Sequence, residues 1–79
     1  MNIKDFQTPI IEAAVIGGEP AGNIACIKCR PGMANAVAAT IDLAATPIPV
    51  VGTIAGDDTV FVLVKTPAEA EQFCGYFEE

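Results

Sequence analysis

The chain has 79 residues, of which 52% are hydrophobic and 18% charged, and its ten acidic and four basic side chains give a formal net charge of −6. A domain of this length buries only about 60% of the surface that its unfolded chain exposes, so this much apolar surface predicts contacts with partner subunits. The acidic balance excludes a nucleic-acid surface on this chain, because binding to phosphates takes clustered Lys and Arg. Its apolar runs are far shorter than the roughly 20 residues of a membrane helix, and its first residues lack the hydrophobic core of a signal peptide. We therefore expect a cytoplasmic protein without a membrane partner.

Apolar and turn-forming segments alternate at the start of the chain. Residues 9–16, PIIEAAVI, predict a first strand, and residues 17–22, GGEPAG, predict a turn. Residues 23–29, NIACIKC, predict a second strand. We expect the two strands to pair as a hairpin.

The three cysteines do not indicate a disulfide framework, because their odd number leaves one unpaired. Cys26 and Cys29 form a lone CxxC, but an odd spacing on a strand points two side chains to opposite faces. Buried reduced thiols therefore fit Cys26, Cys29 and Cys74 better than a metal or redox site.

The next segment changes to a helical period. Residues 31–45 predict a helix that opens at Pro31, since proline suits the first turn of a helix and apolar residues recur at helical spacing. The apolar stripe consists of Ala34, Val37, Ile41 and Ala44. Pro47 and Pro49 follow and predict the end of this helix.

Two strands and a second helix complete the chain. Residues 50–55 and 59–65 predict strands on either side of a Gly-Asp-Asp turn. The second helix then starts with a predicted capping box, in which the Thr66 side chain accepts from the Glu69 N–H and Glu69 reaches back to the Thr66 N–H. This helix runs to the end of the chain, and its inner stripe consists of Ala70, Phe73 and Phe77.

The resulting order, ββαββα, describes one domain over residues 1–79. It predicts an α+β two-layer sandwich, a four-stranded and mainly antiparallel sheet with both helices on one face. The other face of such a sheet is normally polar, but the last strand carries Val60, Val62 and Val64 on one side and Phe61 and Leu63 on the other. The outer face of the first helix is also short of charge, since it holds only Asn35, Ala38, Ala39 and Asp42. We therefore expect a homo-oligomer with contacts through both the sheet and the helix.

Four polar residues stand out in this apolar chain. Asn35 and Asp42 are two helical turns apart and share a helix face, which makes them either the solubilising side of the helix or part of a site. Asp57 and Asp58 suit the positive φ and side-chain hydrogen bonds of a tight turn. However, two carboxylates about 5 Å apart repel by roughly 3 kcal/mol at an effective dielectric near 20. Near an interface, one of them would protonate or recruit a cation.

Three kinds of cation could balance the aspartate pair: a metal ion, a Lys or Arg side chain, or a charged ligand. A metal site has no support beyond the two carboxylates. The chain has no His and no nucleophile paired with a base, so we expect no enzyme. A guanidinium fits best, because its planar N–H donors match carboxylates bidentately, and this predicts a dibasic ligand such as arginine.

Two segments of the chain resemble the C-terminal domain of bacterial arginine repressors. They are VVGTIAGDDTVFVLVKTPAEAE, residues 50–71, and PGMANAVAATID, residues 31–42, and the string GTIAGDDT is the most specific part. The resemblance covers most of the chain in the right order. It implies a domain that binds L-arginine as a co-repressor and assembles as trimers, which pair into hexamers with the ligand between them.

The resemblance also implies a role for individual positions. Asp57 and Asp58 would hold the guanidinium, at least one of them from the opposing trimer. Thr53 and the backbone near Ala55 would line the amino-acid end of the ligand, and Asp42 would contact its α-ammonium. The full set of implied ligand-binding residues is Asn35, Asp42, Thr53, Ala55, Asp57 and Asp58.

Members of that family carry a basic winged-helix domain ahead of this one, and only MNIKDFQTP stands in its place here. We therefore expect an excised effector domain or a shortened homologue, which reaches operator DNA only through the missing domain. Arginine that bridges two trimers would favour the hexamer by its binding free energy. No metal or cofactor is implied. The alternatives are a ligand-independent oligomerisation module and a metal-dependent enzyme that uses Asp57 and Asp58.

Overall fold

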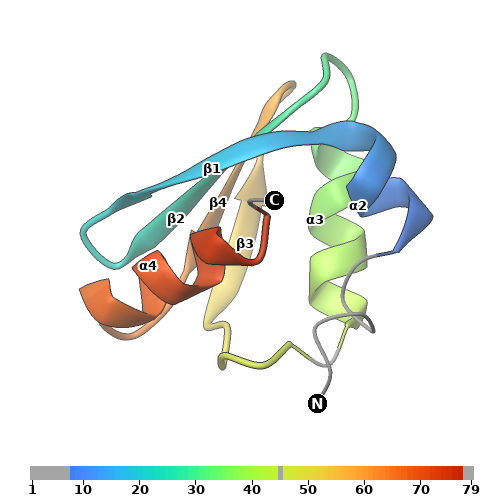
Figure 1. The fold of residues 1–79 in the computed structure, drawn as a ribbon. Helices are drawn as coiled ribbons and strands as arrows, with labels where there is room; N and C mark the ends of the chain where they lie inside the picture. The colour runs from blue at the N-terminus through green and yellow to red at the C-terminus, as the bar shows by residue number, and fades with distance from the viewer. Residues whose placement is uncertain (1–7, 45, 78–79) are drawn as a thin grey trace.

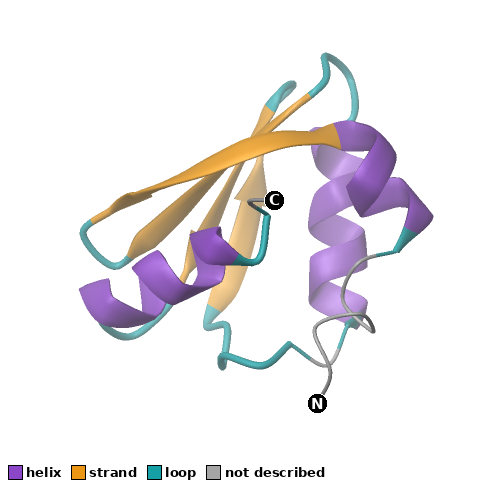
Figure 2. Cartoon of the chain, viewed as in Figure 1, coloured by secondary structure: helices purple, strands orange, loops and turns teal. Residues whose placement is uncertain are grey.

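The computed structural model describes residues 8–44 and 46–77, which form a four-stranded sheet with helices packed against it (Figures 1 and 2). In chain order the elements are α2 (Pro9–Ala14), β1 (Val15–Ala21), β2 (Ile24–Cys29), α3 (Ala34–Leu43), β3 (Gly52–Ala55), β4 (Thr59–Leu63) and α4 (Pro67–Gly75). The strand order is β1-β2-β4-β3, and every neighbouring pair is antiparallel. The predicted α+β class and ββαββα order are confirmed, with α2 as an additional helix ahead of that order.

The side of the sheet that faces the helices forms the core. Alternate residues of the two central strands are buried there, namely Ala25, Ile27, Cys29, Val60 and Val62, as is Val64 directly after β4. Helix α4 packs on β1 and β2, while α3 packs on β3 and β4 (Figure 1). Val37, Ile41 and Phe73 are at most 1% exposed, which confirms the predicted inner stripes, although Ala44 and Phe77 are only half-buried. Within the described ranges, no helix is long and apolar enough to cross a membrane.

The predicted strand over residues 9–16 is wrong, because most of this segment forms helix α2. The Thr8 side chain caps the helix by accepting from the Ile11 N–H at 3.3 Å, and a proline occupies the first turn. Both are signals for a helix start. Ile11 and Ala14, three residues apart, are buried, so this short helix turns its apolar side to the core.

The predicted turn over residues 17–22 is also wrong, since β1 continues through Ala21. β1 lies at an edge of the sheet, where the missing N–H of Pro20 is tolerated. The turn follows at Gly22, whose φ is 60°. Glycine adopts this left-handed conformation without a Cβ penalty.

Helix α3 starts three residues later than predicted, because Pro31 and Gly32 form a turn of their own. The Met33 N–H donates to the Arg30 carbonyl at 3.0 Å, and Gly32 has a φ of 81°. Proline followed by a glycine of positive φ is the pattern of a type II turn. The predicted helix over 31–45 is therefore too long at its start, and position 45 lies outside the described residues.

The remaining elements match their predictions with shorter ends. The predicted strands 50–55 and 59–65 correspond to β3 and β4, and α4 ends before the chain does. One half of the capping box is confirmed, because the Thr66 hydroxyl oxygen accepts from the Glu69 N–H at 3.1 Å. The other half differs, since the Glu69 carboxylate accepts from the Lys65 N–H at 3.2 Å instead of the Thr66 N–H.

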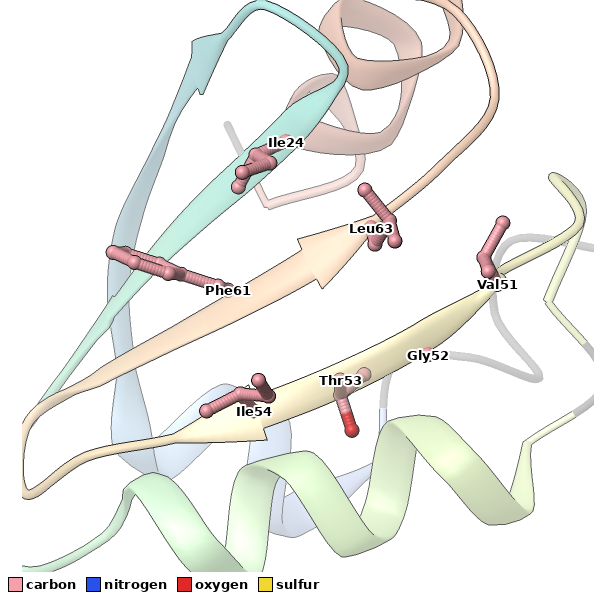
Figure 3. Close-up of a pocket in the computed structure, with 7 residues that line it drawn as sticks. All are labelled: Ile24, Val51, Gly52, Thr53, Ile54, Phe61 and Leu63. Atoms are coloured by element: carbon pink, nitrogen blue, oxygen red, sulfur yellow. The ribbon is translucent and has the colours of Figure 1, made fainter.

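The sheet face that points away from the helices is apolar and is not covered by any described residue. Ile54 is 75% exposed, Phe61 50% and Leu63 38%, which confirms that β4 is apolar on both faces. A hollow of about 340 Å³ lies on this face (Figure 3). Its lining consists of Ile24, Val51, Gly52, Thr53, Ile54, Phe61 and Leu63. We call this surface the outer sheet face.

The type II turn before α3 leads to a test of the fold. Replacing Gly32 with alanine places a Cβ in the left-handed region and should lower the free energy of unfolding by about 1–2 kcal/mol. Gly75→Ala is the matched control, because this residue has no positive φ and open space around its Cβ position. Urea unfolding at a fixed protein concentration measures both variants. Equal stability of Gly32→Ala and the wild type would contradict the turn assignment.

Candidate functional site

The six positions implied as ligand-binding lie together along one edge of the domain. β3 is the edge strand on this side, and α3 packs beside it. Helix and strand run in opposite directions, because the start of α3 bonds to the β3–β4 turn while the end of α3 bonds to the start of β3. We call this surface the α3–β3 strip, which consists of Asn35, Asp42, Thr53, Ala55, Asp57 and Asp58.

One end of the strip is a hydrogen-bonded pair of Asp42 and Thr53. The Thr53 hydroxyl lies 2.9 Å from Oδ1 and 3.0 Å from Oδ2 of Asp42. Thr53 pairs with buried Val62 across the sheet. Although this residue also borders the hollow on the outer sheet face, its hydroxyl points toward α3 (Figure 3). Asp42 remains exposed, which leaves its carboxylate oriented yet open to a cationic ligand.

The stability of helix α3 does not explain why an aspartate occupies position 42. Asp42 sits in the last turn of α3, which has no basic residue, and an acidic side chain at a helix C-terminus is disfavoured by about 0.3–1 kcal/mol. The outer face of α3 is also narrower than predicted, because Ala38 is only 7% exposed. Asn35, Ala39 and Asp42 are exposed, so the predicted polar pair does share one open face.

The other end of the strip is the Asp57–Asp58 turn, which the main chain holds in place. The Asp57 carbonyl accepts from the N–H groups of Gly32 at 3.1 Å and Ala34 at 3.2 Å. The Asp58 carbonyl accepts from the Cys29 N–H at 2.7 Å. Both side chains therefore project from a backbone that is tied to β2 and to the start of α3.

The expectation that this turn needs a positive φ is wrong. Among the described residues, only Gly22 and Gly32 have a positive φ. A Cβ on Gly56 would meet only the Thr59 carbonyl, at an ordinary 3.7 Å. Backbone geometry therefore does not require a glycine, or a residue that tolerates a positive φ, at this turn.

The two carboxylates have different surroundings. Asp58 Oδ1 accepts from the Thr59 hydroxyl at 2.9 Å, and the same Thr59 oxygen accepts from Lys28 Nζ at 3.0 Å. The Asp57 carboxylate is exposed and makes no hydrogen bond to the described part of the chain. Asp58 is thus partly balanced inside the subunit, whereas Asp57 is open.

The sequence alone does not single out Lys28 or Thr59 as members of this site. They face each other across β2 and β4, and only the register of the two strands brings the lysine to the aspartate turn. Asn35 lies one residue after Ala34, whose N–H bonds to the Asp57 carbonyl, so its exposed amide belongs to the same end of the strip.

The backbone of β3 supplies further polar groups. The Gly56 N–H donates to the Thr59 carbonyl at 2.8 Å. Because bonding alternates along an antiparallel pair, Ile54 also bonds toward β4, while the N–H and C=O groups of Thr53 and Ala55 point away from it. The polar backbone groups of Thr53 and Ala55 therefore point toward the open edge of the sheet.

Cys29 lies behind the aspartate turn, and the charge of this turn affects the pKa of the Cys29 thiol. Burial raises the pKa of the Cys29 thiol, the nearby Asp58 carboxylate raises it further, and Lys28 partly offsets both effects. As predicted, Cys26 and Cys29 point to opposite faces, with Cys26 half-buried and Cys29 buried. The structure shows no group of three or more metal-ligating side chains within residues 8–44 and 46–77.

The fold and the strip define a small α+β sandwich domain with an acidic surface strip and an apolar sheet face that none of residues 8–44 and 46–77 covers. The family model described as "Arginine repressor, C-terminal domain" matches residues 11–79. The chain therefore belongs to the arginine repressor family, as its sequence motifs predict.

Three arginine repressors are among the similar proteins. The one from Symbiobacterium thermophilum is 51% identical over 61 residues, which cover 77% of this chain and 39% of that protein. The one from Syntrophomonas wolfei is 41% identical over 70 residues, 89% of this chain and 45% of that protein. The one from Alkaliphilus oremlandii is 40% identical over 75 residues, 90% of this chain and 50% of that protein. The chain spans half the length or less of these curated relatives.

The environment of Cys29 leads to a test by thiol labelling. Because a raised pKa leaves less thiolate at a given pH and burial blocks access, Cys29 should react more slowly than Cys26 with a thiol reagent at pH 8. Peptide mass spectrometry after short exposures locates the label. In denaturant, both cysteines should react at similar rates. Equal rates in the folded chain would contradict the placement of Cys29 behind the turn.

Proposed function

We propose that this chain is the arginine-binding and oligomerisation domain of an arginine-dependent transcriptional repressor. Its family membership supports this function. The observation that carries the proposal is that the α3–β3 strip holds a carboxylate at each end, Asp42 and Asp57, and that arginine carries a cationic group at each end. L-arginine is the co-repressor in this proposal, and no other cofactor is needed.

Each end of the ligand has a matching partner in the strip. The exposed Asp57 carboxylate offers both oxygens to the planar fork of a guanidinium. Asp42, oriented by Thr53, suits the α-ammonium, and the backbone groups at Ala55 suit the polar atoms between. Asn35 and Asp42 are about 10 Å apart along the helix axis at 1.5 Å per residue. This span favours a ligand site to which more than one subunit contributes residues.

The two aspartates take different roles in this proposal. One oxygen of Asp58 is engaged by Thr59 within its own subunit, which leaves only its second oxygen for the guanidinium. Asp57 has no such partner among the described residues, which suits the group that meets the guanidinium directly. Its position at the tip of the hairpin also allows it to reach a ligand held by a facing subunit.

Self-association is the second part of the proposal. The outer sheet face exposes Ile54, Val51 and Phe61 by 75%, 58% and 50%, and the hollow there would be filled by apolar side chains of another copy. Leu43, 88% exposed on α3, provides a second apolar contact. We propose trimers through the outer sheet face, and pairs of trimers joined by arginine at the strip.

Arginine would then act by linkage. A ligand that bridges two trimers stabilises the hexamer by its binding free energy. With a net charge of −6, this domain does not itself suit operator DNA, so DNA contact falls to another domain of the repressor. We propose a regulatory domain without enzymatic activity.

Arginine titration tests the ligand. L-arginine should raise the melting temperature, since a ligand at 100 times its Kd adds about 2.7 kcal/mol of stability, whereas citrulline keeps the shape but lacks the charge and should not. Asp57→Asn should weaken binding roughly 10- to 100-fold, as expected for lost hydrogen bonds to a charged group. Calorimetry measures this, with Glu71→Gln, an exposed acid on α4, as the control.

The same titration separates the alternatives. A ligand-independent oligomerisation module would ignore arginine, lysine and citrulline alike, and a metal-dependent enzyme built on Asp57 and Asp58 would be stabilised by Mg²⁺ or Mn²⁺ instead. No heat from the wild type, or equal heats from the wild type and Asp57→Asn, would reject the proposed arginine site.

Assembly through the outer sheet face is tested separately. Ile54→Lys places a charge in the proposed apolar interface, where an unpaired charge is costly, and should leave smaller oligomers than the wild type. Gln72→Lys introduces the same side chain at an exposed site on α4 and should assemble normally. Size-exclusion chromatography with light scattering, with and without arginine, measures both. Normal assembly of Ile54→Lys would place the interface elsewhere.

A further inference from the structure

A chain of two hydrogen bonds leads from β2 to the aspartate turn. Lys28 Nζ lies 3.0 Å from Thr59 Oγ1, and Thr59 Oγ1 lies 2.9 Å from Asp58 Oδ1. Lys28 and Thr59 are cross-strand neighbours in β2 and β4. The proposed arginine site gives this lysine no role, although it lies close to the aspartate pair.

The direction of both bonds follows from the donors available. A lysine ammonium only donates and a carboxylate only accepts. The Thr59 oxygen must therefore accept from Lys28, and its single proton must go to Asp58. Lys28 thus fixes the orientation of the Thr59 hydroxyl, and the hydroxyl in turn holds one oxygen of Asp58.

We propose that Lys28 and Thr59 are positioning residues for the guanidinium site. Lys28, acting through Thr59, holds the Asp58 carboxylate in one orientation, so that Asp58 presents its second oxygen beside the open carboxylate of Asp57. This inference rests on the proposed arginine site and adds two residues to it. Neither residue touches the ligand, because both act through Asp58.

Charge alone predicts the opposite behaviour for Lys28. A positive side chain near the site repels a guanidinium, so its removal would tighten arginine binding if repulsion were its main effect. If positioning is the main effect, its removal lets Asp58 rotate and weakens binding. The sign of the change in affinity therefore distinguishes the two roles.

The experiment compares arginine affinity by calorimetry among single and double variants. Lys28→Met and Thr59→Val should each weaken binding by about three- to tenfold, the range of one hydrogen bond. Thr59→Ser keeps the hydroxyl and should restore wild-type affinity. Lys65→Met removes the same charge from an exposed position just beyond the opposite end of β4 and should change nothing.

The double variant tests whether the two residues act as one unit. If Lys28 acts only through Thr59, Lys28→Met combined with Thr59→Val should bind no more weakly than Thr59→Val alone, whereas independent effects would multiply. Circular dichroism melts of every variant confirm folding. If Thr59→Val does not fold, the sign for Lys28→Met decides alone, since weaker binding supports positioning.

The experiment distinguishes failure of the proposed arginine site from failure of the positioning role alone. If the wild type binds no arginine, the proposed function fails and this inference fails with it. If the wild type binds arginine while Lys28→Met binds equally or more tightly, or while Thr59→Ser fails to rescue, only the positioning role is overturned. Multiplicative losses in the double variant would likewise overturn the route from Lys28 through Thr59.

Discussion

The carbonyl group of Asp57 joins the two elements that build the site. It accepts two N–H groups, from Gly32 and Ala34, and the second belongs to the first turn of α3. Met33 at the N-cap of α3 provides no side-chain hydrogen bond, so this carbonyl takes the place of a cap and satisfies a donor that would otherwise be unpaired. The residue that we propose to bind the guanidinium thereby also fixes the start of the helix that carries Asn35 and Asp42. A shift of the hairpin tip would move both ends of the strip.

Ligand binding and assembly share the short strand β3. Side chains alternate between the two faces of a strand, and here Thr53 points to α3 and its Asp42 while Ile54 points to the outer sheet face and pairs with Phe61. A four-residue strand therefore contributes to the proposed arginine site with one side and to the proposed subunit interface with the other. If both proposals hold, a change in the packing of one side of β3 would reach the other side through a single backbone. This strand would then be the shortest route between arginine binding and assembly.

The sequence predicts most of the fold and names polar residues that the structure places along one strip, and each wrong prediction has a physical reason. The Thr-Pro signal at Thr66 was interpreted correctly as a helix start, yet the same signal at Thr8 was outweighed by a short apolar run, whose period does not separate strand from helix. Pro31 suits a helix start as well as a type II turn, and only the following Gly32, with a φ of 81°, decides between them. Lys28 and Thr59 meet through strand register, which local patterns do not contain.

The two ends of α3 place the strip's carboxylates in opposite electrostatic settings. Asp57 lies beside the N-terminus of α3, to which its carbonyl group is bonded, and the helix dipole favours negative charge there. Asp42 lies at the C-terminus, where the helix dipole opposes it by about 0.3–1 kcal/mol and Thr53 is its partner. A cation bound at Asp42 would relieve an existing unfavourable interaction. A cation at Asp57 would bring no such relief, because the helix dipole already favours negative charge there. In the proposed complex, the helix dipole at Asp42 thus favours binding of the α-ammonium. Binding of the guanidinium depends instead on the geometry of its two hydrogen bonds to Asp57.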